Sequence, residues 1–117
     1  NNLTIEQSTV SLDDSYLLSE TEPGEKIFIN SFGYDTLYLL THDRSLANRA
    51  AYILPWYMDW YEEWEIEDLV NEQPRFAIWN PDMEIWGYSH FCNEMDSYIK
   101  EHYSRISETS NIWVKED

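Results

Sequence analysis

Two short runs of consecutive apolar residues constrain the fold of this chain most. Residues 26–30 read KIFIN and residues 75–79 read RFAIW. A strand with one wet face alternates apolar and polar residues, so an uninterrupted apolar run is typical of a strand covered on both faces. Both runs therefore predict buried strands of a parallel sheet with helices on each side.

Helical patterns separate and follow these strands. Residues 60–73 form the clearest long helix, because apolar residues recur at helical spacing until Pro74 stops it. Residues 90–103 predict a last helix, whose apolar stripe consists of Phe91, Met95, Tyr98, Ile99 and His102. Shorter helices are expected from Ser11 to the Pro23-Gly24 turn and over residues 34–41, and a second strand over residues 49–54.

Strands that alternate with helices predict an α/β fold, a small layered sandwich with a mainly parallel sheet flanked by helices. The β-prone segments 104–108 and 111–115 predict a C-terminal antiparallel hairpin at the edge of this sheet. At 117 residues, the whole chain (1–117) is expected to form a single domain. Because it begins at Asn1 without a methionine, we expect it to be excised from a larger protein.

The charge of the chain excludes some classes of partner. A formal net charge of −16 argues against nucleic acid, whose phosphates would be repelled. It is compatible with a neutral sugar, with a cationic partner or with plain solubility. A single cysteine, Cys92, excludes an internal disulfide scaffold.

No motif in the sequence predicts catalysis, a metal site or a cofactor. The chain has no GxSxG elbow, no HExxH pair and no CxxC pair. The turn from Ser31 to Asp35 contains one glycine, whereas phosphate-binding turns need several. Cys92 follows Phe91 on the apolar side of a helix, where thiols are usually inert packing. We therefore predict no catalytic residue, no metal ligand and no cofactor.

A cluster of aromatic and acidic residues is the best candidate for binding. Residues 53–81 hold four of the six tryptophans, and no lysine or arginine lies between Arg49 and Arg75. The candidate binding residues are Trp56, Tyr57, Asp59, Trp60 and Trp64. Their rings can stack on a sugar while carboxylates accept its hydroxyl hydrogens. They can equally pack against the sheet or form a protein or membrane-domain interface.

Several segments, in order, resemble a family pattern. These segments are LYLLTHDR (residues 37–44), NRAAY (48–52), EDL (67–69), QPRFAI (73–78) and SYIKEHY (97–103). Together they are similar to the soluble C-terminal domain of bacterial polytopic membrane glycosyltransferases. Those enzymes transfer sugars from polyprenyl-phosphate donors, and protein mannosyltransferases are their best-known relatives. The resemblance spans most of residues 26–103.

The resemblance implies an accessory role. In that family the catalytic carboxylates lie in the membrane part, so no catalytic residue is transferred to this chain. The implied domain is non-catalytic, stands on the extracytoplasmic side of the cell membrane, and covers the active site or helps to hold the acceptor. Its implied partners are the transmembrane part of the same polypeptide and a glycan acceptor. The alternative is a stand-alone carbohydrate- or protein-binding module.

Overall fold

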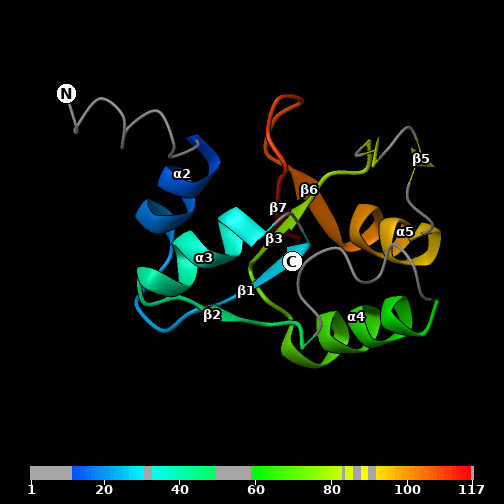
Figure 1. Cartoon of the computed structure of the whole chain (residues 1–117), viewed down its shortest axis with the longest axis horizontal. Helices are drawn as coiled ribbons and strands as arrows, with labels where there is room; N and C mark the ends of the chain where they lie inside the picture. Colours follow the sequence, from blue (N-terminus) through cyan, green and yellow to red (C-terminus); the bar gives the residue numbers. More distant parts are fainter. Residues whose placement is uncertain are drawn as a thin grey trace.

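A five-stranded mixed sheet forms the middle of the molecule (Figure 1). The computed structural model describes residues 12–30, 33–49, 59–82, 84–85, 88–89 and 92–116. Its strands are β1 (Lys26–Asn30), β2 (Ser45–Leu46), β3 (Phe76–Trp79), β6 (Tyr103–Arg105) and β7 (Ile112–Lys115), in the order β2-β1-β3-β7-β6. β1 is parallel to both of its neighbours, whereas β7 and β6 are antiparallel additions. The predicted α/β class and the C-terminal antiparallel hairpin are confirmed.

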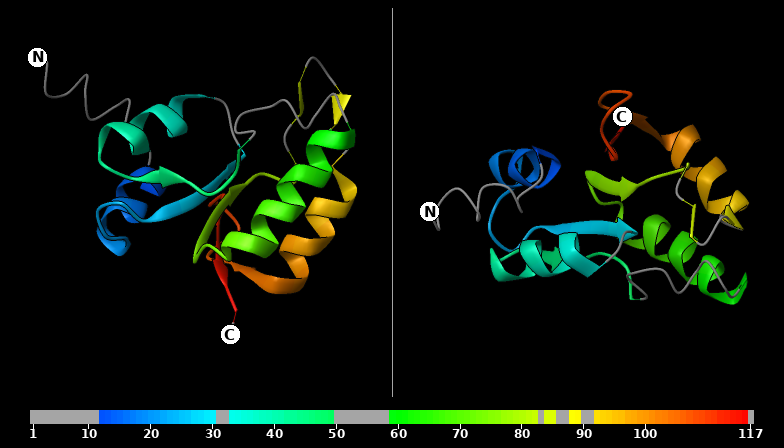
Figure 2. Two further views of the ribbon diagram at one scale, coloured as in Figure 1. Left: turned by 90° about the horizontal axis from the view of Figure 1, so that it is seen from below. Right: turned by 45° about the horizontal axis from the view of Figure 1, so that its top comes forward.

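Within the described part of the chain, four helices cover the two faces of the sheet. Leu17 of α2 (Leu12–Glu20) and Leu39 of α3 (Gly33–Thr41) belong to one core cluster. Leu69 of α4 (Asp59–Glu72) and Ile99 of α5 (Asn93–His102) belong to a second cluster. α4 and α5 lie side by side, as Figure 2 shows. The molecule is thus a layered sandwich with helix pairs on opposite faces.

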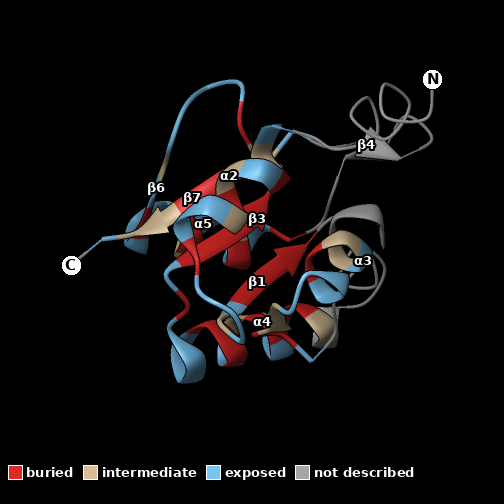
Figure 3. Cartoon of the chain, turned by 90° about the vertical axis from the view of Figure 1, so that its left-hand side faces the viewer, coloured by how far each residue is buried: buried red, intermediate tan, exposed pale blue. Residues whose placement is uncertain are grey.

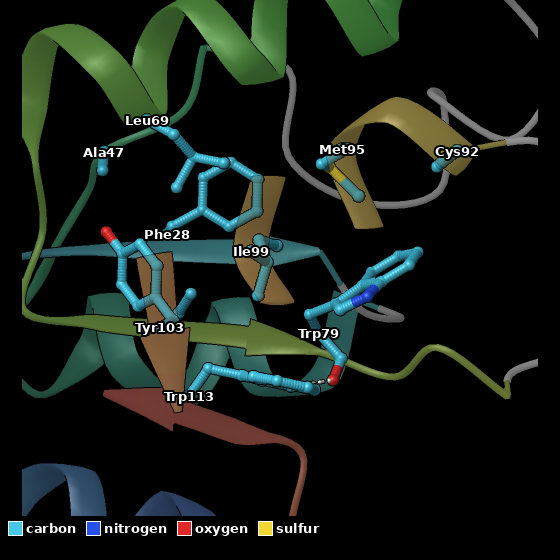
Figure 4. Packing of buried hydrophobic residues seen from close by; sticks show 10 residues of the cluster. Phe28, Ala47, Leu69, Trp79, Cys92, Met95, Ile99, Tyr103 and Trp113 are labelled. Atoms are coloured by element: carbon cyan, nitrogen blue, oxygen red, sulfur yellow. Dashed lines mark hydrogen bonds between the residues drawn. The ribbon is translucent and has the colours of Figure 1, made fainter. Parts of the chain in front are cut away.

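The central strand β1 divides its side chains between these two layers. Ile27 and Ile29 pack in the α2–α3 cluster, and Phe28 between them packs in the α4–α5 cluster (Figure 4). Both sets are fully buried, as the red strand in Figure 3 shows. The neighbouring strand β3 alternates in the same way, with every residue buried. The uninterrupted apolar runs therefore do mark strands covered on both faces.

The observed bounds of several elements differ from those predicted from the sequence. The second strand was expected at residues 49–54, but the strand that pairs with β1 is β2, at Ser45–Leu46; residues 50–54 lie outside the described part. The last helix begins at Asn93 rather than at residue 90, and residues 90 and 91 are not described. His102, predicted on the apolar stripe, is exposed and stacks on Tyr98. A short pair, β4 (Glu84–Ile85) with β5 (Tyr88–Ser89), was not predicted.

A buried side-chain amide lengthens the pairing between β1 and β2. After Ala47, whose N–H donates to the carbonyl of Ile27 at 2.9 Å, the chain continues to the buried Asn48. The Oδ1 of Asn48 accepts from the N–H of Ile29 at 3.0 Å, and its Nδ2 donates to the carbonyl of Ile29 at 2.8 Å. One amide side chain thus does what a further strand residue would do. It satisfies two backbone groups at the edge of β1 that lie away from water.

Replacing this amide tests how much it stabilises the sheet. We expect Asn48→Ala to lower the free energy of unfolding by about 3 kcal/mol, because it leaves the N–H and carbonyl of Ile29 buried and unpaired. Urea denaturation followed by circular dichroism measures the change. The matched control, Asn71→Ala, removes an exposed amide on α4 and should leave stability unchanged or slightly higher. Equal effects of the two variants would contradict this role.

Candidate functional site

Polar side chains gather where β1 and β3 end, on the face covered by α4 and α5. β1 ends at the fully buried Asn30, and β3 ends at Trp79, its neighbour in the parallel register. The chain leaves β1 through α3 towards β2 on one side and returns through α4 to β3 on the other. In open α/β sheets, ligands bind at such a switch point, outside the carboxyl ends of the strands. This end of the sheet is therefore the candidate site.

A buried carboxyl from α4 meets the end of β1. The Nδ2 of Asn30 donates to both carboxyl oxygens of Glu65, at 3.2 and 3.0 Å, and both residues have no exposed surface. Burial raises the pKa of Glu65 well above its usual value; the Asn30 hydrogen bonds oppose this rise, and the nearby Asp68 and Glu62 add to it. The folded chain therefore keeps the proton of this carboxyl to a higher pH than an exposed glutamate does. Within the described part of the chain, the Oδ1 of Asn30 has no hydrogen-bond partner.

A second buried carboxylate of α4 caps the neighbouring helix. Glu62 accepts a hydrogen bond from the backbone N–H of Met95 at 3.1 Å. Met95 is the third residue of α5, and the residue before that helix, Cys92, makes no side-chain capping hydrogen bond. The first N–H groups of a helix need such acceptors, which usually come from the capping residue itself. Here the acceptor comes from α4, so Glu62 joins the two helices.

Cys92 lies in the same acidic environment. Its side chain is fully buried, and burial raises the pKa of the thiol to about 12, with Glu65, Glu62 and Asp96 contributing in that order. A thiol is nucleophilic only as the thiolate, so Cys92 stays protonated and unreactive at neutral pH. The structure thus agrees with the prediction that this cysteine is packing.

Trp79 is fixed in position by hydrogen bonds on two sides. Its Nε1 donates to Asp96 Oδ1 at 2.7 Å, and the second oxygen of Asp96 pairs with Lys100 at 2.8 Å. Its carbonyl oxygen accepts from Trp113 Nε1 at 2.9 Å, the dashed line in Figure 4. The indole is therefore a rigid part of the core beside α5.

The predicted binding cluster is described only in part. Trp56 and Tyr57 lie outside the described residues, and of Asp59 and Trp60 only the backbone, at the start of α4, is described. Trp64 lies one turn further along α4, with 37% of its surface exposed.

Neighbouring side chains cover part of the Trp64 ring. The guanidinium of Arg49 lies 5.2 Å from the ring centre, and Tyr61 meets the ring edge-on at 5.3 Å. Arg49 also pairs with Glu67 at 2.6 Å and with Asp68 at 3.1 Å. Trp64 is therefore a partly exposed ring held against a salt-bridge network, on the flank of α4 nearest to Arg49.

Sequence reasoning did not single out the buried polar residues Asn30, Asn48, Glu62 and Glu65. One signal was present: Tyr61, Glu65 and Leu69 are spaced by four, so an acid occupies the middle of an apolar helical stripe. An acid at such a position is expected either to point outward or to find a buried partner. The sequence does not identify Asn30 as that partner, because 35 residues separate the two.

The remaining findings concern a metal site, a membrane span and similarity to known proteins. The described residues contain no group of three or more His, Cys, Asp or Glu side chains able to hold a metal ion. No helix within the described part of the chain has the length and apolar character needed to cross a membrane. Comparisons with protein-family models, with curated proteins and with solved structures find no match to this chain.

The raised pKa of Glu65 predicts how stability depends on pH. The unfolded chain loses this proton near pH 4.5, whereas the folded chain keeps it to a higher pH. The folded state then binds more protons, so this group lowers the free energy of unfolding as the pH rises above 4.5 and up to the folded pKa. The penalty is absent at lower pH.

Glu65→Gln should remove this penalty. We expect the stability of the variant relative to the original chain to rise as the pH increases from 4.5 towards the folded pKa of Glu65. Urea unfolding across that range measures the difference. Glu63→Gln, an exposed carboxyl on the same helix, is the matched control and should show no such trend. A stability difference for Glu65→Gln that does not change with pH would rule out a raised pKa for Glu65.

Proposed function

We propose that this chain is a non-catalytic accessory domain of a membrane glycosyltransferase that uses a polyprenyl-phosphate sugar donor. In this role it covers the active site or helps to hold the acceptor. Its partners are the transmembrane part of the same polypeptide and a glycan acceptor. The domain then stands at the cell membrane, on the extracytoplasmic side. The ordered resemblance of residues 37–103 to that family's C-terminal domain supports the proposal.

The observation that carries the non-catalytic part of the proposal is the state of the titratable groups at the end of the sheet. Glu65 is fully buried and its pKa is raised, and burial raises the pKa of the Cys92 thiol to about 12. General-base and nucleophilic catalysis need groups that reach the substrate and can lose their proton near neutral pH. Both side chains are fully buried and do not reach the surface, and the Cys92 thiol also keeps its proton at neutral pH, so they favour a structural role over a chemical one.

The position of the polar cluster supports a holding role. It lies at the switch point of the sheet, where α/β domains commonly receive ligands. The hydrogen bonds of Trp79 to Asp96 and of Asn30 to Glu65 hold this end of the sheet in a fixed geometry. A domain that orients an acceptor near another active site needs such rigidity, because misplacement of a bound group slows transfer.

A stand-alone carbohydrate-binding module is the second candidate. The partly exposed ring of Trp64 favours it, because aromatic rings stack on sugar faces, and the exposed Glu63 and Glu67 lie beside it on α4. The charge of −16 does not repel a neutral sugar. Binding by this module would need no membrane-embedded partner.

The coding sequence that surrounds this segment tests the first candidate. We expect the same reading frame to encode several apolar spans of about 20 residues each, since that length crosses the hydrocarbon core of a membrane. Removing this segment from the full-length protein should then lower sugar transfer while leaving the membrane part inserted. A complete reading frame without such spans would contradict the glycosyltransferase proposal.

Titration with neutral oligosaccharides tests the second candidate. If the module binds sugar through the aromatic cluster, calorimetry should show saturable binding that Trp64→Ala weakens about tenfold or more, as should Trp56→Ala and Trp60→Ala. Val70→Ala, which truncates another exposed apolar residue of α4, is the matched control and should bind normally. Unchanged binding in all three tryptophan variants would exclude this surface.

A further inference from the structure

A groove of about 390 Å³ runs between α4 and α5. Among the described residues, one of α4 and five of α5 line it: Ile66, Asn93, Glu94, Ser97, Tyr98 and Glu101. Ile66 lies on the flank of α4 that faces α5, whereas Trp64 lies on the flank nearest to Arg49. The groove therefore lies on a different flank of α4 from Trp64.

Apolar and acidic groups share this groove in a regular arrangement. Ile66 and Tyr98 are half-buried against the core and form its apolar part. Glu94 and Glu101 are exposed and seven residues apart on α5, which places their Cα atoms about 10 Å apart along the helix axis. Tyr98 lies between them in sequence, and its ring stacks on His102 at 4.3 Å.

The two carboxylates have no positive partner within the described part of the chain. Lys100, the lysine on the same helix, is already paired with Asp96 at 2.8 Å. Arg49, which precedes α4, pairs with Glu67, and Lys26 at the start of β1 pairs with Glu72. With 23 acidic and seven basic residues in the whole chain, the potential at this groove is negative. Glu94 and Glu101 are therefore open to pairing with a cationic group of another molecule.

The remaining lining favours a peptide over a simple cation. Asn93 and Ser97 carry side chains that can donate to and accept from a peptide backbone. The apolar surface of Ile66 and Tyr98 suits the methylene stems of Lys and Arg, and an aromatic face attracts their charged heads. A polyproline-II segment repeats every three residues and rises about 3.1 Å per residue, so side chains i and i+3 lie on one side about 9 Å apart. This spacing matches that of Glu94 and Glu101.

We propose that the groove between α4 and α5 binds an extended basic peptide segment. Two cationic side chains of the peptide, three residues apart, pair with Glu94 and Glu101. The methylene stems of these side chains lie on Tyr98 and Ile66. The peptide backbone forms hydrogen bonds with Asn93 and Ser97. This interaction is independent of the sugar-related role, since it uses neither the end of the sheet nor the Trp64 flank.

A synthetic peptide of repeating arginine–proline–proline units, titrated into the isotope-labelled 117-residue chain, tests this proposal. At low salt we expect saturable amide-shift changes that are largest for Ile66 and for α5. The double variant Glu94→Gln/Glu101→Gln should raise Kd about tenfold, because two exposed ion pairs are lost. Raising the salt to about 0.15 M should weaken binding to the original chain.

A second double variant controls for net charge. Glu22→Gln/Glu108→Gln removes the same two charges from exposed positions on other elements and should leave Kd unchanged. Equal weakening by both double variants would mean non-specific attraction and would overturn the proposal, as would the absence of binding. Spermidine serves as the small-cation probe. If it competes at the same affinity as the peptide, the groove selects a polyamine and the peptide proposal is wrong.

Discussion

The complete burial of β1 is the constraint on which the rest of the structure depends. The strand has parallel neighbours at both edges and helix layers on both faces, so its last four residues have no contact with water. Any polar group there must be satisfied by the protein itself. Asn48 does this at one edge and Glu65 does it at the end of the strand. A chain whose charge is −16 therefore buries one of its acids at its centre, where burial raises the pKa of that carboxyl.

The layered fold was predictable because a strand covered on both faces needs apolar residues at consecutive positions. An uninterrupted apolar run can only be a strand covered on both faces or a piece of buried helix, and its length and flanking turns favoured the strand at β1 and β3. The boundaries of β2 were not predictable in this way. It has two residues, and a side-chain amide from Asn48 supplies the pairing that a longer strand would provide.

The candidate site was less accessible to sequence reasoning. Composition drew attention to the aromatic cluster, of which the structure describes one side chain, that of Trp64. The meeting of Asn30 with Glu65 depends on how α4 lies over the sheet, and the raised pKa depends on burial that only packing produces. The groove likewise exists only because α4 and α5 are neighbours.

The capping of α5 by Glu62 has a consequence for how the molecule assembles. A short helix without its own cap is unstable in isolation, and here the missing acceptor lies 33 residues earlier in the chain. α5 therefore gains its full first turn only when α4 is already in place. The two helices form and open as one cooperative unit, and the protection of the Met95 amide from hydrogen exchange reports the docking of α4 rather than the intrinsic strength of α5.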